Sequence, residues 1–248
     1  MPGRHLLVSL VLLLAPAAHA SSVNLRWDNC WGDGGAQNRS FACDTNTGSQ
    51  SIVGSFVSPN AVHGVLRADF TVQIQFGPPT VPSWWMFKSA GTCRQASLSV
   101  RVLPPQAAAQ CIDWASSAAL GVFASYNIST FTPNLVVLTV ASAVSTEAAA
   151  DVVAGQEYFA FQLRIDNLKT VGLGACEGCN AGACIYLRTV QLHSADGSNN
   201  PFLGIGIAPG DQVSDARALW QPANAAPACG FPVPASSRTW GEVKALYH

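Results

Sequence analysis

Residues 44–49 (DTNTGS) carry side chains suited to holding a metal ion. Asp44 and Asn46 alternate as at the start of a calcium loop, where carboxylate and amide oxygens line a tight turn. The third acidic position and the distal glutamate of the full calcium motif are missing from this segment. Because Asp and Asn also cap backbone amides in ordinary turns, the sequence leaves two alternatives open, a Ca²⁺ site at Asp44 and Asn46 or a structural turn.

A second pattern that could bind a ligand is the adjacent pair Trp84 and Trp85, among seven tryptophans. Neighbouring residues of a strand face opposite sides of the sheet. If the pair lies in a strand, one indole enters the core and the other reaches solvent, where it can stack on a sugar ring. Core packing of both indoles is the alternative.

All eight cysteines follow residue 20. An even number of cysteines predicts disulfides if the chain is secreted. They are Cys30, Cys43, Cys93, Cys111, Cys176, Cys179, Cys184 and Cys229. Proximity in sequence favours the pairs Cys30–Cys43 and Cys93–Cys111, with the other four pairing among themselves. The spacing Cys-x2-Cys-x4-Cys from Cys176 is also compatible with zinc, with Cys229 or His193 as the fourth ligand.

Signatures of catalysis are scarce. After residue 20 the chain keeps His63, His193 and His248, and no motif nominates a serine partner for them. A glycosidase needs two carboxyl groups at a defined separation, which spacing alone does not show for the dispersed candidates Asp113, Glu147, Asp151, Glu157 and Asp166. No catalytic residue is therefore assigned, and a non-enzymatic role is favoured.

The ends of the chain indicate where it acts. Residues 1–20 have a short basic start, an apolar run over 6–15 and the small residues of a cleavage site, as in a secretory signal peptide. No later stretch is apolar enough to span a membrane. We expect a secreted, periplasmic or cell-surface protein. The formal net charge of −1 gives no electrostatic case for binding nucleic acid.

Period-two alternation of apolar and polar residues dominates the mature chain and predicts antiparallel strands. The predicted strands are 65–76, 96–103, 134–144, 157–167 and 184–193, with weaker candidates at 52–57, 121–128 and 202–207. The segment 134–144 is apolar on both faces and is expected to be a central strand. One short helix is expected within 107–119.

These strands, separated by Gly- and Pro-rich turns, predict an all-β fold, a single β-sandwich or jelly roll held by disulfides. We expect a signal peptide over 1–20, the sandwich over 21–221, a Pro/Ala-rich tether over 222–238 and a short C-terminal helix over 239–248. In that last segment, Thr239 and Glu242 have the spacing of a capping box.

Several segments together resemble a family of uncharacterised secreted bacterial proteins. The resemblance rests on WDNC at 27–30, FACDTNTG at 41–48, the Cys-x2-Cys-x4-Cys spacing and TWGEVKALY at 239–247. The family has no assigned activity, so the resemblance implies compartment and architecture alone.

The sequence thus predicts a secreted or surface-associated binding or structural module, with an extracellular glycan or an envelope protein as its partner. The alternative is an extracellular polysaccharide hydrolase on a jelly-roll scaffold. Because one fold hosts many functions, the choice between them depends on the site.

Overall fold

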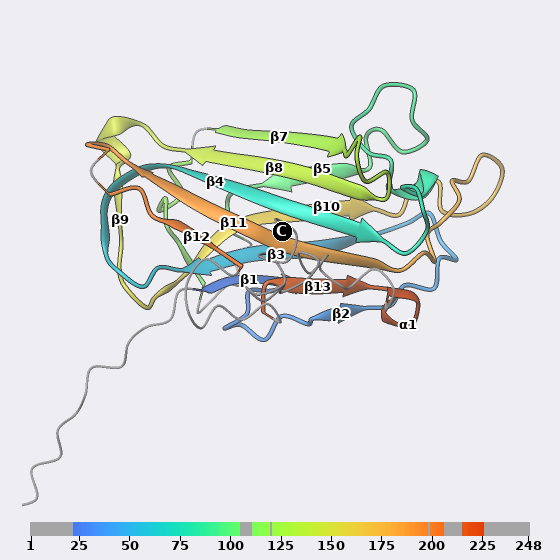
Figure 1. Ribbon diagram of the computed structural model, residues 1–248, viewed down its shortest axis with the longest axis horizontal. Coiled ribbons are helices and arrows are strands. Elements are labelled where there is room, and N and C mark those ends of the chain that lie inside the picture. The colour runs from blue at the N-terminus through green and yellow to red at the C-terminus, as the bar shows by residue number, and fades with distance from the viewer. Residues whose placement is uncertain (1–21, 105–110, 120, 198, 206–214, 226–248) are drawn as a thin grey trace, which may run out of the picture.

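The computed structural model describes residues 22–104, 111–119, 121–197, 199–205 and 215–225. Two antiparallel-dominated sheets pack face to face as a β-sandwich, confirming the predicted all-β fold (Figure 1). Among the described residues, no helix has the length and apolar character needed to cross a membrane. The predicted signal peptide and C-terminal helix lie outside the described residues.

The smaller sheet has five strands. In spatial order they are β1 (Ser22–Trp27), β3 (Ser49–Val57), β10 (Glu157–Asp166) and β5 (Leu98–Arg101), with β6 (Ile112–Asp113) also pairing with β10. All these pairings are antiparallel except that of β6, which runs parallel to β10.

The larger sheet has eight strands. Its main path is β2 (Asn38–Arg39), β13 (Arg217–Trp220), β11 (Ala183–Ser194), β4 (Val62–Phe76), β8 (Leu135–Ala143) and β7 (Gly121–Ile128). Two short strands lie off this path, with β12 (Phe202–Gly204) beside β11 and β9 (Ala150–Val152) beside β4. The long pairing of β4 with β11 forms the centre of the sheet.

The alternation read from the sequence sets the inner face of each sheet. In β4, Ala68, Phe70, Val72, Ile74 and Phe76 are buried, while the residues between them are half-buried. Burying one face of each sheet against the other removes apolar area from water, which is the main favourable term in folding. The predicted strand at 121–128 has the bounds expected, and the others agree to within a few residues.

The segment 134–144 is confirmed as a central strand, because β8 lies between β4 and β7. Its residues alternate between buried and half-buried. One local prediction is wrong. In place of the expected helix within 107–119, the described part contains the strand β6 followed by a turn. Asp113 stabilises this turn because its carboxylate accepts hydrogen bonds from the N–H groups of Ala115 and Ser117.

The disulfide pairing differs from the one that proximity in sequence favoured. The structure joins Cys30 to Cys111, Cys43 to Cys179 and Cys93 to Cys176, with Cα–Cα distances of 6.0, 6.0 and 6.1 Å. Cys184 is also disulfide-bonded, and Cys229 lies outside the described residues. The paired cysteines are 81 to 136 residues apart in sequence. Because they lie in loops that the strands bring together, distance along the chain does not predict their partners.

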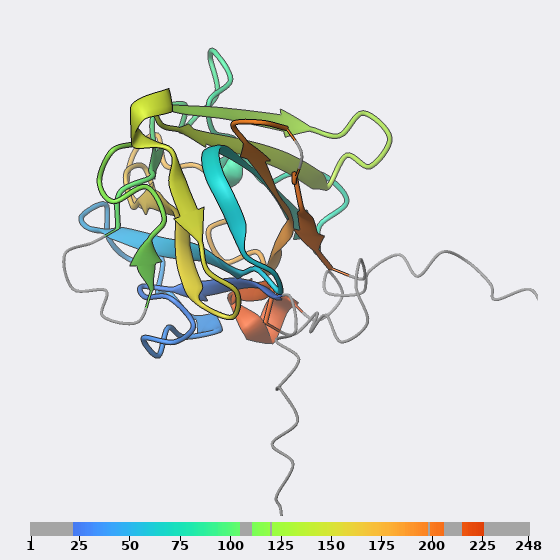
Figure 2. The ribbon, with the colours of Figure 1, turned by 90° about the vertical axis from the view of Figure 1, so that its left-hand side faces the viewer.

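One end of the sandwich, which we call the loop end, collects the segments of interest (Figure 1). The register brings Phe76 at the end of β4 beside Ala183 at the start of β11, which in turn faces Trp220 at the end of β13. The loops that leave these positions are therefore neighbours. The Cys93–Cys176 disulfide joins the loop after β4 to the loop before β11, and Cys43–Cys179 joins that second loop to the segment between β2 and β3. Figure 2 views the sandwich from the opposite end.

The first four residues of the expected tether belong to the folded domain. Residues Pro222–Ala225 form the short helix α1, in which Ala225 is fully buried. The side chain of Asn224 donates a hydrogen bond of 2.9 Å to the carbonyl of Asn180. The folded domain therefore extends through residue 225, and the remainder of the predicted tether lies outside the described residues.

Candidate functional site

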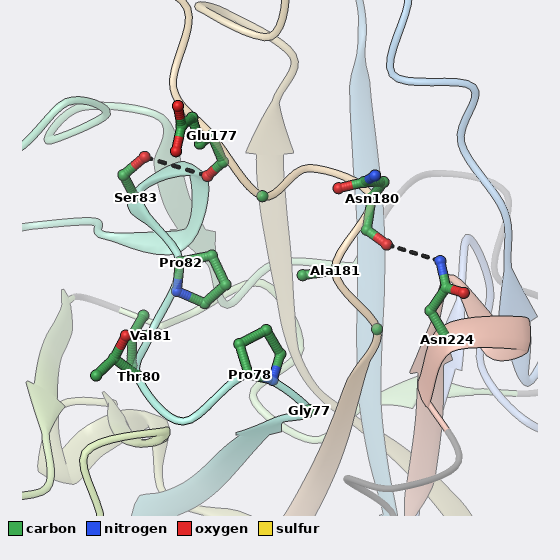
Figure 3. A pocket seen from close by; sticks show the side chains of 12 residues that line it. Gly77, Pro78, Thr80, Val81, Pro82, Ser83, Glu177, Asn180, Ala181 and Asn224 are labelled. Atoms are coloured by element: carbon green, nitrogen blue, oxygen red, sulfur yellow. Dashed lines mark hydrogen bonds between the residues drawn. The ribbon is translucent and has the colours of Figure 1, made fainter.

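The loop end contains a cavity of about 660 Å³. Three segments line it: 77–83 after β4, 177–182 before β11, and Asn224 of α1. In Figure 3, the rings of Pro78 and Pro82 lie on one side, while Asn180 and Asn224 lie on the other. A cavity of this size is in the range that small-molecule ligands occupy.

The backbone of the two loops is held in place by hydrogen bonds across the cavity wall. The N–H of Gly77 donates to the carbonyl of Gly182 over 3.3 Å, and the N–H of Trp84 donates to the carbonyl of Glu177 over 2.8 Å. The hydroxyl of Ser83 donates to the same Glu177 carbonyl over 3.1 Å. These bonds fix the distance between the walls, so the cavity is formed before any ligand arrives.

Two glycines make the close approach of the walls feasible. A Cβ on Gly182 would lie 2.1 Å from the carbonyl carbon of Asn224, and one on Gly178 would lie 2.3 Å from the Cβ of Pro82. Gly178 also has a φ of +95°, which disfavours any residue with a Cβ. The packing of the cavity walls therefore requires glycine at positions 178 and 182.

The groups that face the cavity are mostly neutral. Glu177 is the one ionisable residue in the lining, and its side chain is exposed. The remaining polar side chains belong to Thr80, Ser83, Asn180 and Asn224. Hydroxyls, amides and a single carboxylate beside proline rings can bind a ligand by hydrogen bonds and apolar contact.

The prediction that one of the two adjacent indoles reaches solvent is wrong. Trp84 and Trp85 lie in the 3₁₀ helix η1 (Ser83–Trp85), and both are fully buried. Successive side chains of a 3₁₀ helix are about 120° apart, so both indoles can enter the core, as they cannot from a strand. A buried indole offers no face to a sugar.

These two indoles instead pack behind the cavity wall, against Trp220. The Trp84 ring stacks on Trp220 at 5.3 Å between centroids, and Trp85 meets Trp220 edge-on at 5.6 Å. The Nε1 of Trp220 donates a 2.7 Å hydrogen bond to the carbonyl of Cys179, in the cavity loop. The Nε1 of Trp84 donates a 2.9 Å bond to the hydroxyl of Thr170. The aromatic cluster thus orients the loop before β11, which the disulfides of Cys176 and Cys179 also hold.

A buried arginine completes this cluster. The Arg94 guanidinium lies 3.6 Å from the centroid of the Trp84 ring, and its Nη1 donates a 2.9 Å hydrogen bond to the Trp84 carbonyl. Burial lowers the pKa of Arg94 to about 10, although the nearby Asp166 favours its charged form. Contact between a cation and an indole face is attractive.

The residues proposed as calcium ligands have different roles. The Oδ1 of Asn46 accepts hydrogen bonds from the N–H groups of Thr170 at 2.7 Å and Val171 at 2.9 Å, and its Nδ2 donates to the Val171 carbonyl at 3.0 Å. A carbonyl oxygen that accepts two hydrogen bonds has both lone pairs engaged. Asn46 therefore acts as the anchor of a loop 124 residues away. Asp44 is exposed nearby. The geometry favours the structural turn.

The described residues contain one group of side chains that could hold a metal ion, Cys30, Cys111 and Glu157. Its two sulfurs are joined in a disulfide, so they are not available as thiolate ligands. The Glu157 carboxylate accepts hydrogen bonds from the N–H groups of Trp31 and Gly32 and from the hydroxyl of Ser55. This group stabilises the fold.

The other dispersed carboxylates are similarly engaged. Asp151 accepts from the N–H of Gly64 and pairs with His63 at 2.9 Å, and these hydrogen bonds lower the pKa of Asp151. Backbone and side-chain hydrogen bonds also lower the pKa of Glu147. Asp166 pairs with Arg164 over 3.3 Å. None of the five carboxylates named in the sequence lines the loop-end cavity.

The two histidines described by the structure also bond to aspartates. His63 contacts Asp151, and the Nε2 of His193 lies 2.9 Å from Asp69. Within the described part of the chain, no serine hydroxyl is bonded to either imidazole. The sequence missed the cavity residues because Thr80, Glu177 and Asn224 form no local motif and become neighbours only in three dimensions.

Comparison with known proteins finds no matching family model and no matching curated protein. Among solved structures, a type II cohesin domain from the cellulosome of Acetivibrio cellulolyticus aligns with a TM-score of 0.37 and 8% identity, covering 83% of this chain and 98% of that one. A cohesin module from a family 33 glycoside hydrolase of Clostridium perfringens aligns with a TM-score of 0.32 and 7% identity, covering 78% and 100%.

Proposed function

We propose that the protein is a secreted binding module whose loop-end cavity takes a neutral, hydroxyl-rich ligand such as a saccharide unit. The observation that carries this proposal is the preformed cavity of about 660 Å³ lined by amides, hydroxyls and two proline rings. Saccharides offer many hydroxyls for hydrogen bonding and C–H faces for apolar contact. Disulfides are typical of proteins in an oxidising, extracytoplasmic compartment.

Binding is favoured over polysaccharide hydrolysis by the carboxylates. Glycoside hydrolysis usually requires two carboxyl groups on either side of the scissile bond. Within the cavity lining, Glu177 is the single carboxylate. A ligand held by one carboxylate and several neutral groups is oriented without a second acid or base to cleave it.

The proposal is tested by measuring how the purified mature protein binds a panel of polysaccharides and their soluble oligosaccharides, by pull-down and calorimetry. Ala181→Trp places an indole in the cavity, because Ala181 lines it and is half-buried. The matched control is Ala195→Trp, at an exposed alanine after β11. We expect Ala181→Trp to abolish saccharide binding and Ala195→Trp to preserve it. Binding that survives Ala181→Trp, or its absence across the panel, would refute the proposal.

A protein partner is the second candidate, because of the loop that precedes the cavity segment. Leu173 is fully exposed and Leu168 is half-exposed, although Asn46 and the Cys93–Cys176 disulfide hold this loop firmly. Exposed apolar side chains mark a contact with another protein where they lie together in a patch, and this loop contributes both leucines to such a surface. In that case Leu173→Ser would release the protein from the cell surface and leave its thermal stability and saccharide binding unchanged.

A further inference from the structure

The strand β7 forms one edge of the eight-stranded sheet, where it pairs with β8 alone. It lies along the upper rim of the molecule in Figure 1. Its eight residues, Gly121–Ile128, have the sequence GVFASYNI. The outer side of an edge strand presents unpaired N–H and C=O groups, which can pair with a strand of another chain.

β7 lacks the features with which proteins protect such an edge. It contains no charged residue and no proline, and all its residues pair with β8 without a bulge. Charged side chains, proline, bulges and shortness are the usual devices against edge-to-edge pairing. An eight-residue neutral edge is therefore a site for strand addition.

The other edges of the described sheets do carry such protection. β2 has two residues, one of which is Arg39. β5 has four residues and ends in the exposed Arg101. β1 is longer, but the N–H of its Leu25 donates to the carbonyl of Asp215, and Arg26 pairs with the Asp215 carboxylate. β7 differs from the protected edges in both length and charge.

We infer that β7 pairs with the β7 strand of a second copy of this chain, antiparallel across a two-fold axis. Such an interface uses the same surface on both copies, so the edge must be its own complement. An antiparallel strand meets this condition because its outward N–H and C=O groups match those of an identical strand. In every register of this pairing, neutral residues face neutral residues, so no like charges oppose each other.

The position of side chains on β7 supplies a test that leaves the core intact. Tyr126 is buried and points inward, so Ser125 and Asn127 lie on the outer face. In the dimer, lysines at these two positions would bring four positive charges together along the seam. The matched control places lysines at Thr71 and Gln73 of β4, which lie half-buried on the same face but away from the edge.

The experiment is analytical ultracentrifugation of the mature protein over a range of concentrations. We expect the parent and the T71K/Q73K variant to sediment as a dimer, and S125K/N127K to weaken association by at least ~10-fold or to be monomeric. Amide hydrogen exchange should protect the edge amides of β7 in proportion to the dimer fraction. Equal circular dichroism spectra and melting temperatures establish that the variants are folded.

A parent protein that is monomeric at every concentration would overturn the inference. So would a dimer that S125K/N127K leaves intact, because such a dimer uses another surface. Equal weakening by the control pair would show a general effect of charge on the outer face and would also contradict β7 pairing. The outcome is separate from saccharide binding, since the cavity lies in the loops and the lysines lie on the strand.

Discussion

Replacing Asn46 by alanine tests whether residues 44–49 form a structural turn or a calcium site. The substitution removes three hydrogen bonds to the backbone of Thr170 and Val171, at 2.7, 2.9 and 3.0 Å. Each such bond contributes about 0.5–1.5 kcal/mol. Because Asn46 is exposed and water can replace part of them, we expect a total loss of about 2 kcal/mol. For a domain of this length, that corresponds to a fall in melting temperature of about 4–8 °C.

The assay is thermal unfolding followed by circular dichroism, with EDTA and then with millimolar calcium. The matched control is Asp44→Ala, at the exposed neighbour for which the structure shows no hydrogen bond to the 167–176 loop. If the turn is structural, Asn46→Ala loses the same stability with and without calcium, and Asp44→Ala changes little. A parent protein that calcium stabilises, and that loses this response in Asp44→Ala, would show the reasoning to be wrong, because a ligand specific to the folded state raises its stability.

Three further predictions follow from the core. Burial raises the pKa of the Tyr126 phenol, which donates a hydrogen bond to the Trp85 carbonyl. The contribution of the neutral phenol to the stability of the fold is therefore complete below the ordinary pKa of 10.0 and declines above it. Tyr126→Phe should cost about 1 kcal/mol at neutral pH but show a shallower loss of stability between about pH 10 and 12, measured by urea unfolding at each pH. Trp84→Ala and Trp85→Ala should each destabilise by about 3–5 kcal/mol in the same assay, since both rings are fully buried; a fully stable variant with altered saccharide binding would contradict this. Thiol titration of the unfolded, unreduced protein should find about zero free thiols, and four free thiols with bound zinc would refute the disulfide assignment.

The sequence predicts the strands well because alternation is a local signal. In β4, each inward side chain of the 65–76 prediction from Ala68 onward is buried, since the pleat itself forces successive residues to opposite faces. The same signal does not give the order of strands. Nor does it identify which of the short strands, such as β2 with its two residues, complete a sheet edge. Those depend on pairing between residues far apart in the chain.

The site was harder to predict because its chemistry depends on non-local contacts. The motif at residues 44–49 was detected, but its role depends on Thr170 and Val171, more than 120 residues away. Trp84 and Trp85 do not face opposite sides as in a strand, because the N–H of Trp85 bonds to the Pro82 carbonyl and closes a 3₁₀ turn. Proximity likewise failed for the cysteines, whose partners are fixed by the convergence of loops.

The structure shows where the few carboxylates of this chain are used. With 14 acidic residues in 248, few carboxylates are available, and those named as catalytic candidates are bonded to backbone amides, hydroxyls, a histidine or an arginine. The loop-end cavity is lined by neutral groups, apart from the exposed Glu177. Exposed charges are screened by salt, whereas hydrogen bonds between neutral groups are much less affected. The saccharide binding that we propose for this cavity would depend on shape and hydrogen bonding, so we expect it to depend little on ionic strength.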